Sequence, residues 1–332
     1  MVKINLHNII SIEVKNSPSY IKKFLKEEFF YFIKMKKKKN NIDIDFKDKV
    51  LVPKNSIKLK EDFFYNSKLK TFYFSKDGRA LSYDLSLYFK NKISIKIEKD
   101  FNIWFFLYII ENSLYLLLSR KKVCMLHAGA VKKNNFSYII FGPQGSGKTL
   151  YTLNKIKEGY SFLGDEYIFL NKYGECLSFP RAVNFKKFHN SHYKLASNYK
   201  WNSLKMIEKF KWFFKQLIKT IILRPDWKPM VRLRINRIFP ETKIVHKTKI
   251  TNIIFNFKNN RKIKESIITS RYPKMILKNI QFEMVNRFIS IYKCIFIPKD
   301  VFLKKIIADT RKLEKNKIEI IKSFIYKSHK ER

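Results

Sequence analysis

The chain has 332 residues, of which 45% are hydrophobic and 16% aromatic, and its formal net charge is +43 at pH 7. This apolar content excludes an intrinsically disordered protein, because it is enough for a hydrophobic core. The length fits two domains or one large α/β domain with additions. The three cysteines, Cys124, Cys176 and Cys294, form no CxxC or Cys/His cluster. Their spacing supports neither a disulfide framework nor a zinc site, and it favours a reduced, cytoplasmic setting.

The positive charge comes mostly from lysines scattered along the whole chain beside abundant Asn, Ile, Phe and Tyr. A/T-rich codons favour this residue set, so the charge need not select a nucleic acid or an anionic membrane as partner. The densest basic run, 35–41, lacks the Gly, aromatic or Arg interleaving of RNA-binding segments, and we predict a solvated loop there. Nucleic-acid binding is therefore the minority interpretation.

Residues 1 to 100 are predicted to form a small α+β unit whose role the sequence does not reveal. Short apolar runs with period-two alternation indicate strands, and Asp77-Gly78 is typical of a turn between two of them. The predicted strands are 9–14, 72–74 and 93–97, and apolar spacing predicts a helix over 20–34.

The most apolar run, 103–118, is interrupted by Glu111-Asn112-Ser113 and is shorter than the ~20 residues of a membrane span. It predicts a buried helix over 101–120, with a membrane span as the weaker alternative. No apolar segment typical of a secretory signal follows Met1.

Residues 101–332 are predicted to form a second domain, a nucleotide-binding domain with a helical C-terminal extension. After the helix over 101–120, the predicted elements are strands at 123–131 and 136–141, a helix at 150–157, a strand at 160–163 and a hairpin at 167–179. They are followed by a helix at 205–223, a strand at 250–257 and helices at 279–296 and 301–327. No internal repeat is visible.

All eight glycines except Gly78 lie between residues 129 and 174, which suggests that backbone approaches a ligand there. They are densest in a complete phosphate-binding motif, which consists of Gly142, Pro143, Gln144, Gly145, Ser146, Gly147, Lys148 and Thr149. The motif follows an apolar strand and precedes a helix, as its chemistry requires. We therefore predict that it binds a nucleoside triphosphate, and a glycine-rich turn with an exposed lysine is the alternative.

The spacing of the motif suits a triphosphate. Its glycines let successive backbone N–H groups point at a phosphate, and the helix that begins near Lys148 adds the positive end of its dipole. Lys148 is predicted to reach the β- and γ-phosphates, and Thr149 to offer its hydroxyl to Mg²⁺. ATP is favoured over GTP because no Asp follows Asn171-Lys172 at the spacing of a guanine-specific motif.

An acidic pair, Asp165-Glu166, ends the strand that comes directly after the motif's helix. Two carboxylates facing a triphosphate can divide two tasks, because one holds the metal and the other takes a proton from an acceptor hydroxyl. A solvent-exposed pair that opens a hairpin is the alternative. We favour the functional interpretation because the pair follows so closely on a phosphate loop.

The residues at 126–131, 139–149 and 159–166, and more weakly Phe179-Pro180-Arg181, resemble the HPr serine kinase/phosphorylase family and its HPr-kinase-like relatives. The resemblance covers residues 126 to 181 and lies in the order and spacing of a histidine, the phosphate loop, a glycine and an acidic pair. It implies an α/β fold with a P-loop core of the phosphoenolpyruvate-carboxykinase type. Beyond Phe179 the glycine-rich and arginine-containing signatures of true HPr kinases do not follow, so the acceptor stays open.

By this resemblance His127 would lie near the γ-phosphate or the acceptor, and Lys148 would be catalytic. Thr149 would bind Mg²⁺ together with Asp165, and Glu166 would stand where the family has its proton-accepting aspartate. Without its neighbours, His127 would be interpreted as a satisfied core histidine. A set of arginines is interpreted as surface charge rather than as phosphate ligands, namely Arg181, Arg232, Arg234 and Arg237.

Together these patterns predict an ATP- and Mg²⁺-dependent phosphotransferase that acts on a hydroxyl of a protein serine or a small molecule, with Glu166 or Asp165 as the catalytic base. An ATP-hydrolysing or ATP-sensing accessory protein of a biosynthetic pathway is the second interpretation, and a basic nucleic-acid-binding ATPase is the third. The sequence leaves the acceptor and the formation of a homo-oligomer open.

Overall fold

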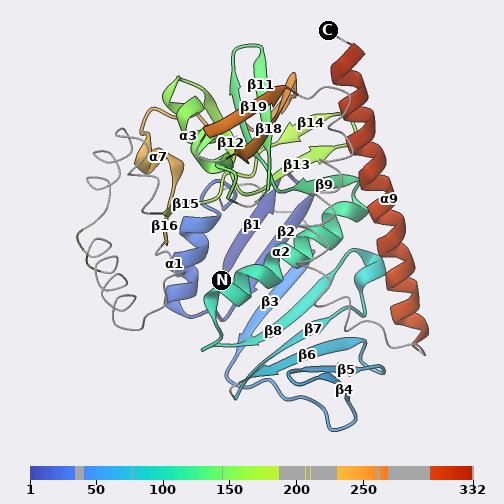
Figure 1. The fold of residues 1–332 in the computed structure, drawn as a ribbon. Helices are drawn as coiled ribbons and strands as arrows, with labels where there is room; N and C mark the ends of the chain where they lie inside the picture. The colour runs from blue at the N-terminus through green and yellow to red at the C-terminus, as the bar shows by residue number, and fades with distance from the viewer. Residues whose placement is uncertain are drawn as a thin grey trace. The chain divides into compact units, whose positions relative to one another are not determined.

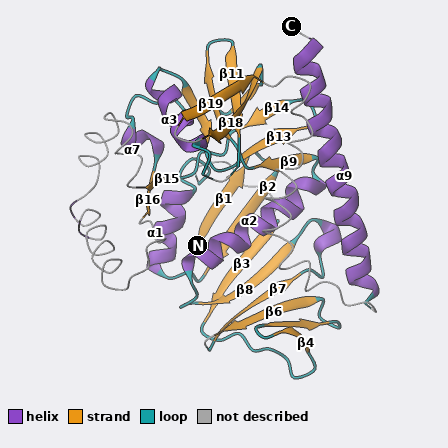
Figure 2. Ribbon diagram, viewed as in Figure 1, coloured by secondary structure: helices purple, strands orange, loops and turns teal. Residues whose placement is uncertain are grey.

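The computed structural model describes residues 1–33, 41–76, 78–143, 145–186, 206, 210, 230–259, 262–267 and 300–330. Within these residues the protein is a mixed α/β structure with several sheets and few helices (Figure 2). None of the helices in this described part is both long enough and apolar enough to cross a membrane.

The chain divides into two compact units, and each is considered by itself. The first contains the described residues of Met1–His127, Phe169–Glu175 and Ser270–Arg332, and the second contains those of Ala128–Ile168 and Cys176–Thr269. The sequence predicts a domain boundary near residue 100. In the structure, residues 101–127 belong to the same unit as the N-terminal strands.

The first unit is built on a twisted sheet of eight strands. In chain order these are β1 (Val2–Leu6), β2 (Ile10–Lys15), β3 (Ile42–Lys47), β4 (Ile57–Lys60), β5 (Phe63–Asn66), β6 (Thr71–Lys76), β7 (Arg79–Asp84) and β8 (Ile93–Glu98). Their order in the sheet is β1-β2-β3-β8-β7-β6-β5-β4 (Figure 1). β3 pairs in parallel with β2 and β8, and the other neighbours pair antiparallel.

Period-two alternation explains why these segments form strands. In β3, Ile42, Ile44 and Phe46 are buried, whereas Asp43 and Asp45 between them are half-buried. Successive side chains of a strand point to opposite faces, so the three apolar groups share the face that is covered by protein.

Helices accompany this sheet within the first unit. They are α1 (Ser19–Glu28), α2 (Ile103–Arg120) and α9 (Val301–Lys330). The Asn102 side chain caps α2 by accepting the backbone N–H groups of Trp104 and Phe105 at 2.8 and 3.3 Å. α2 packs against β2, α9 and the short strand β9 (Val123–Leu126).

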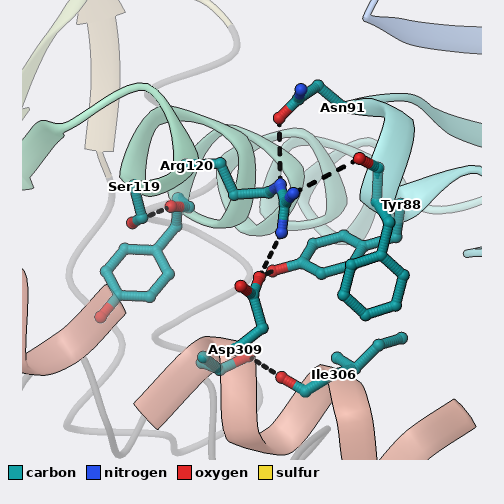
Figure 3. A network of polar contacts seen from close by, with 9 residues as sticks. Tyr88, Asn91, Ser119, Arg120, Ile306 and Asp309 are labelled. Carbon is teal, nitrogen blue, oxygen red and sulfur yellow. Dashed lines mark hydrogen bonds and ion pairs between the residues drawn. The ribbon is translucent and has the colours of Figure 1, made fainter. Parts of the chain in front are cut away.

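Arg120, the last residue of α2, anchors α9 through a polar network (Figure 3). Its guanidinium donates to Oδ1 of Asn91 at 3.0 Å and forms an ion pair with Asp309 of α9. Tyr88 donates its hydroxyl to the same carboxylate at 2.9 Å. These hydrogen bonds to a charged group fix α9 to the end of α2 and to the segment that joins β7 to β8.

The second unit is built on a sheet of five strands. They are β10 (Gly129–Lys133), β11 (Phe136–Phe141), β12 (Ser161–Gly164), β18 (Asn252–Asn259) and β19 (Lys262–Ile267). The order is β12-β10-β11-β18-β19. β11 pairs in parallel with β18, and β10 pairs antiparallel with both β11 and β12. Helix α3 (Lys148–Lys157) packs against β10 and β11.

The remaining elements are short. They are β13 (Ile168–Asn171), β14 (Glu175–Leu177), β15 (Val183–Lys186), β16 (Met230–Leu233), α7 (Ile235–Ile238) and β17 (Lys247–Lys249). β15 and β16 form a two-stranded antiparallel ribbon. The core of the second unit joins side chains of α3, of the sheet and of this ribbon, including Val131, Ile140, Tyr151, Ile156, Phe162, Val183, Leu233 and Ile254.

Several sequence predictions are confirmed. They are the helix predicted over 101–120, which corresponds to α2, and the elements that correspond to β11, α3 and β18. The prediction of one strand over 123–131 is wrong, because β9 ends at Leu126 and β10 begins at Gly129, where the chain passes between units. The helix predicted over 20–34 ends at Glu28. Predictions on 35–40, Asp77, Gln144 and 279–296, and on 205–223 apart from Met206 and Phe210, lie outside the described residues.

The approach of α3 to β10 depends on Gly129. A Cβ on this residue would lie 2.3 Å from Oγ1 of the buried Thr152. We expect Gly129→Ala to lower the free energy of unfolding by about 1–3 kcal/mol through overpacking. Denaturant unfolding should show that Thr152→Ala, which removes the clashing oxygen, recovers most of this loss in the double variant. Additive losses would contradict the proposed contact.

Candidate functional site

The segment 142–149, called here the motif loop, connects the end of β11 to the start of α3 in the second unit. Gly145 and Gly147 have φ angles of 80° and 94°, which L side chains rarely adopt. Gly147 is the residue that precedes the first turn of α3, so its left-handed conformation turns the chain into the helix. The glycines are therefore required by the backbone path itself.

Lys148 begins α3, and its side chain folds back over the motif loop. Its Nζ donates to the carbonyl oxygens of Gly142 and Pro143 at 2.6 and 3.1 Å, and the residue is 7% exposed. The lysine of the motif is therefore buried and not exposed, and triphosphate binding stays a prediction. A buried ammonium group at the start of a helix gives the loop a strong positive potential.

Ser146 is a second polar group of the motif loop that is buried. It is 2% exposed, and its Oγ has no hydrogen-bond partner among the described residues. Buried hydroxyl groups are normally hydrogen-bonded, so an unsatisfied one inside a loop of this type indicates a place where a ligand or water completes the bonding.

Asp165 follows β12 and reaches the first turn of α3. Thr149 donates its hydroxyl to Oδ2 of Asp165 at 2.9 Å, and Asp165 is 6% exposed. Its other oxygen, Oδ1, is buried and has no partner among the described residues. Burial raises the pKa of Asp165 to about 7, while the Thr149 hydrogen bond and the charge of Lys148 oppose this shift.

Gly164 makes this position of Asp165 possible. A Cβ on Gly164 would lie 2.6 Å from the carbonyl oxygen of Tyr167 and 3.3 Å from that of Phe179. The backbone N–H of Phe179 also donates to the carbonyl of Leu163 at 2.7 Å. The turn that carries the acidic pair is therefore closed tightly by backbone on both sides.

Glu166 lies beside two arginines of the same unit. Its Oε2 is 3.3 and 3.4 Å from Nη1 and Nη2 of Arg232, and 3.8 Å from Nη2 of Arg181. The Arg181 side chain is 3% exposed and that of Arg232 is 11% exposed. Two largely buried guanidinium groups thus offset the charge of this carboxylate.

The prediction that Arg181 and Arg232 are surface charges is therefore wrong. Arg181 could have been recognised, because it follows Phe179-Pro180 at a point that the backbone brings next to the acidic turn. Nothing local distinguishes Arg232 from Arg234, which is separated from it by one residue. Only the pairing of Asn184 with Arg232 in the β15–β16 ribbon brings it to Glu166.

Of the predicted site residues, the structure brings Lys148, Thr149, Asp165 and Glu166 into one unit. His127 belongs to the other unit, is half-buried and follows β9. Its role near a γ-phosphate or an acceptor stays a prediction. Gln144 lies outside the described residues.

The described part of the chain contains no group of three or more His, Cys, Asp or Glu side chains that could hold a metal ion. Mg²⁺ at nucleotide sites commonly uses only one or two protein oxygens, with phosphates and waters as its other ligands. Thr149 and Asp165 fit this use, because the unsatisfied Oδ1 of Asp165 is an additional oxygen beside the Thr149 hydroxyl.

Comparisons with known proteins find no family model that matches this chain and no curated protein that is significantly similar to it. The resemblance to HPr-kinase-like proteins therefore rests on the residues between 126 and 181 alone.

Asp165 should make the stability of the ligand-free protein depend on pH. The pKa of Asp165 is about 7 in the folded protein, above the 3.8 of an exposed aspartate, so the native state binds its proton more tightly than the unfolded chain does. Stability is therefore lost as pH rises from about 4 to 7. We expect Asp165→Asn to be more stable than wild type at pH 8, by on the order of 2–4 kcal/mol.

Denaturant unfolding at pH 8 and pH 5, without nucleotide or Mg²⁺, measures this difference. The advantage of Asp165→Asn should shrink by more than half at pH 5. Glu241→Gln removes an exposed carboxylate of the same unit and serves as the control, with no such trend expected. A wild type that is the more stable protein at pH 8 would refute the assignment.

Proposed function

We propose that the protein is an ATP-dependent, Mg²⁺-requiring phosphotransferase of the HPr-kinase-like type. It would transfer the γ-phosphate to a hydroxyl group of a protein serine or of a small molecule. The observation that carries the proposal is the buried Asp165 carboxylate, which Thr149 of the motif loop holds at 2.9 Å while its Oδ1 stays unsatisfied.

The motif loop supports triphosphate binding through its shape and charge. Its two left-handed glycines and the start of α3 are the features by which backbone N–H groups and a helix dipole bind phosphate. Lys148 now donates to two loop carbonyls, and a phosphate oxygen would be a stronger acceptor for the same ammonium. A bound Mg²⁺ would offset the negative charge of the phosphates, and Thr149 with Asp165 would hold it.

Glu166 is the residue proposed to accept the proton of the acceptor hydroxyl. It is adjacent to Asp165, and its carboxylate is less buried than that of Asp165. Since Asp165 is engaged by Thr149, the two carboxylates differ in environment, as a division between metal ligand and base requires.

An ATP-hydrolysing or ATP-sensing accessory protein is the second candidate. The observation that favours it is the ion pairing of Glu166 with Arg232. This guanidinium occupies the carboxylate oxygen that a general base would turn toward an acceptor hydroxyl. A protein that only senses ATP would have no need of that base, and one that hydrolyses ATP would have no acceptor hydroxyl to deprotonate.

Transfer of label from γ-labelled ATP to fractions of a cell lysate, or to a panel of hydroxyl compounds, tests the proposal. We expect wild type to label an acceptor and Lys148→Ala to lower the rate about 100-fold or more, because it removes a preorganised cation from the phosphates. Lys157→Ala removes an exposed lysine at the end of the same helix and should retain activity.

Thermal melting of each variant should establish that it is folded, because Lys148 is buried. Equal labelling by wild type and Lys148→Ala would refute phosphoryl transfer at this site. Release of free phosphate at a rate that no acceptor changes would favour the second candidate.

A further inference from the structure

Arg232 and Arg181 hold Glu166 in different ways. The Arg181 guanidinium lies 5.5 Å from the ring centre of Phe179 and 5.9 Å from that of Tyr167, and its side chain is 3% exposed. Arginine stacked on aromatic rings in this way has little freedom to move. Arg181 is therefore a positive charge that is held in place 3.8 Å from Oε2 of Glu166.

The contact of Arg232 with Glu166 is looser. Its Nη1 and Nη2 atoms reach the same oxygen of Glu166, Oε2, at 3.3 and 3.4 Å. Optimal pairs of guanidinium and carboxylate have N–O distances of about 2.7–2.9 Å and often bind both oxygens. Arg232 is tied more closely to the carbonyl oxygen of Ala182, at 2.8 Å through Nη2.

Arg232 also lies within electrostatic range of the Thr149 and Asp165 pair. Glu166, which Arg232 contacts at 3.3 Å, directly follows Asp165 in the chain. A guanidinium this close to the candidate phosphate site is attracted by two anions, the Glu166 carboxylate and any phosphate bound at the motif loop.

We propose that Arg232 is shared between Glu166 and the transferring phosphoryl group, so that a bound γ-phosphate draws Arg232 away and releases Glu166 to act as the base. This inference rests on the proposed function. Arg232 would be a catalytic residue, because it would touch the phosphate, and Arg181 a positioning residue, because it keeps the released carboxylate in place.

Release of Glu166 from Arg232 would allow the transfer of the γ-phosphoryl group to the acceptor hydroxyl. The acceptor hydroxyl oxygen forms a bond to the γ-phosphorus, and the bond from that phosphorus to the β,γ-bridging oxygen breaks. The bridging oxygen keeps the bonding electrons and leaves as part of ADP, and the hydroxyl proton goes to Glu166. Arg232 on the phosphoryl oxygens would offset charge in the transition state, which arginine does well by its planar set of donors.

In this arrangement Glu166 can act as the base only when a γ-phosphate is bound. Without it, the guanidinium of Arg232 covers the oxygen that would take the proton. Glu166 and the γ-phosphate therefore compete for one guanidinium, and variants of the two residues should change triphosphate affinity in opposite directions.

Calorimetric titration of the full chain with Mg²⁺ and either a non-hydrolysable ATP analogue or ADP tests this competition. We expect Arg232→Gln to weaken binding of the analogue about tenfold or more, because a charged hydrogen bond is lost, and to leave ADP binding nearly unchanged. Glu166→Gln should tighten binding of the analogue several-fold without affecting ADP, while lowering phosphoryl transfer.

Lys249→Gln removes an exposed positive charge of the same unit and serves as the control, with both affinities unchanged. Arg232→Lys, which keeps the charge but not the planar donors, should give an intermediate loss, and it also covers the case in which Arg232→Gln does not fold. Equal weakening of both nucleotides by Arg232→Gln, or an unchanged analogue affinity in Glu166→Gln, would overturn the sharing. Wild type that binds neither nucleotide would overturn the proposed function and this inference together.

Discussion

The candidate site depends on one constraint, the burial of the Asp165 carboxylate against the first turn of α3. Thr149 supplies a single hydroxyl to Oδ2, while Oδ1 has no partner among the described residues. A carboxylate in such surroundings is costly to ionise, and the raised pKa of Asp165 reflects that cost. The tight packing of Gly164 and of Gly129 is what holds β12, β10 and α3 close enough for this arrangement.

Three positively charged side chains of the second unit lie near the acidic pair. Lys148 gives positive charge at the motif loop, and Arg181 and Arg232 give it at Glu166. Such a set favours an anionic ligand with several charges, because phosphate oxygens are strong acceptors for ammonium and guanidinium groups.

The sequence predicts the motif loop and its flanking elements well, because glycine spacing and an apolar strand are local signals, as β11 and α3 show. It also predicts that Thr149 and Asp165 belong together. The sequence does not predict the approach of Arg232 to Glu166, because Arg232 comes from a segment of the ribbon that is distant in the chain. The break between β9 and β10 is missed for the same reason, since the apolar run at 123–131 continues across a boundary that only tertiary structure defines.

The central claim is that the motif loop and Asp165 together bind a magnesium-bound triphosphate, and equilibrium binding of an ATP analogue with and without Mg²⁺ tests it most directly. We expect saturable binding of one nucleotide per chain that tightens when Mg²⁺ is added. This tightening should be lost in Asp165→Asn and retained in Glu166→Gln, because only the first removes the proposed metal ligand. The absence of saturable binding, or an effect of Mg²⁺ that survives in Asp165→Asn, would contradict the account.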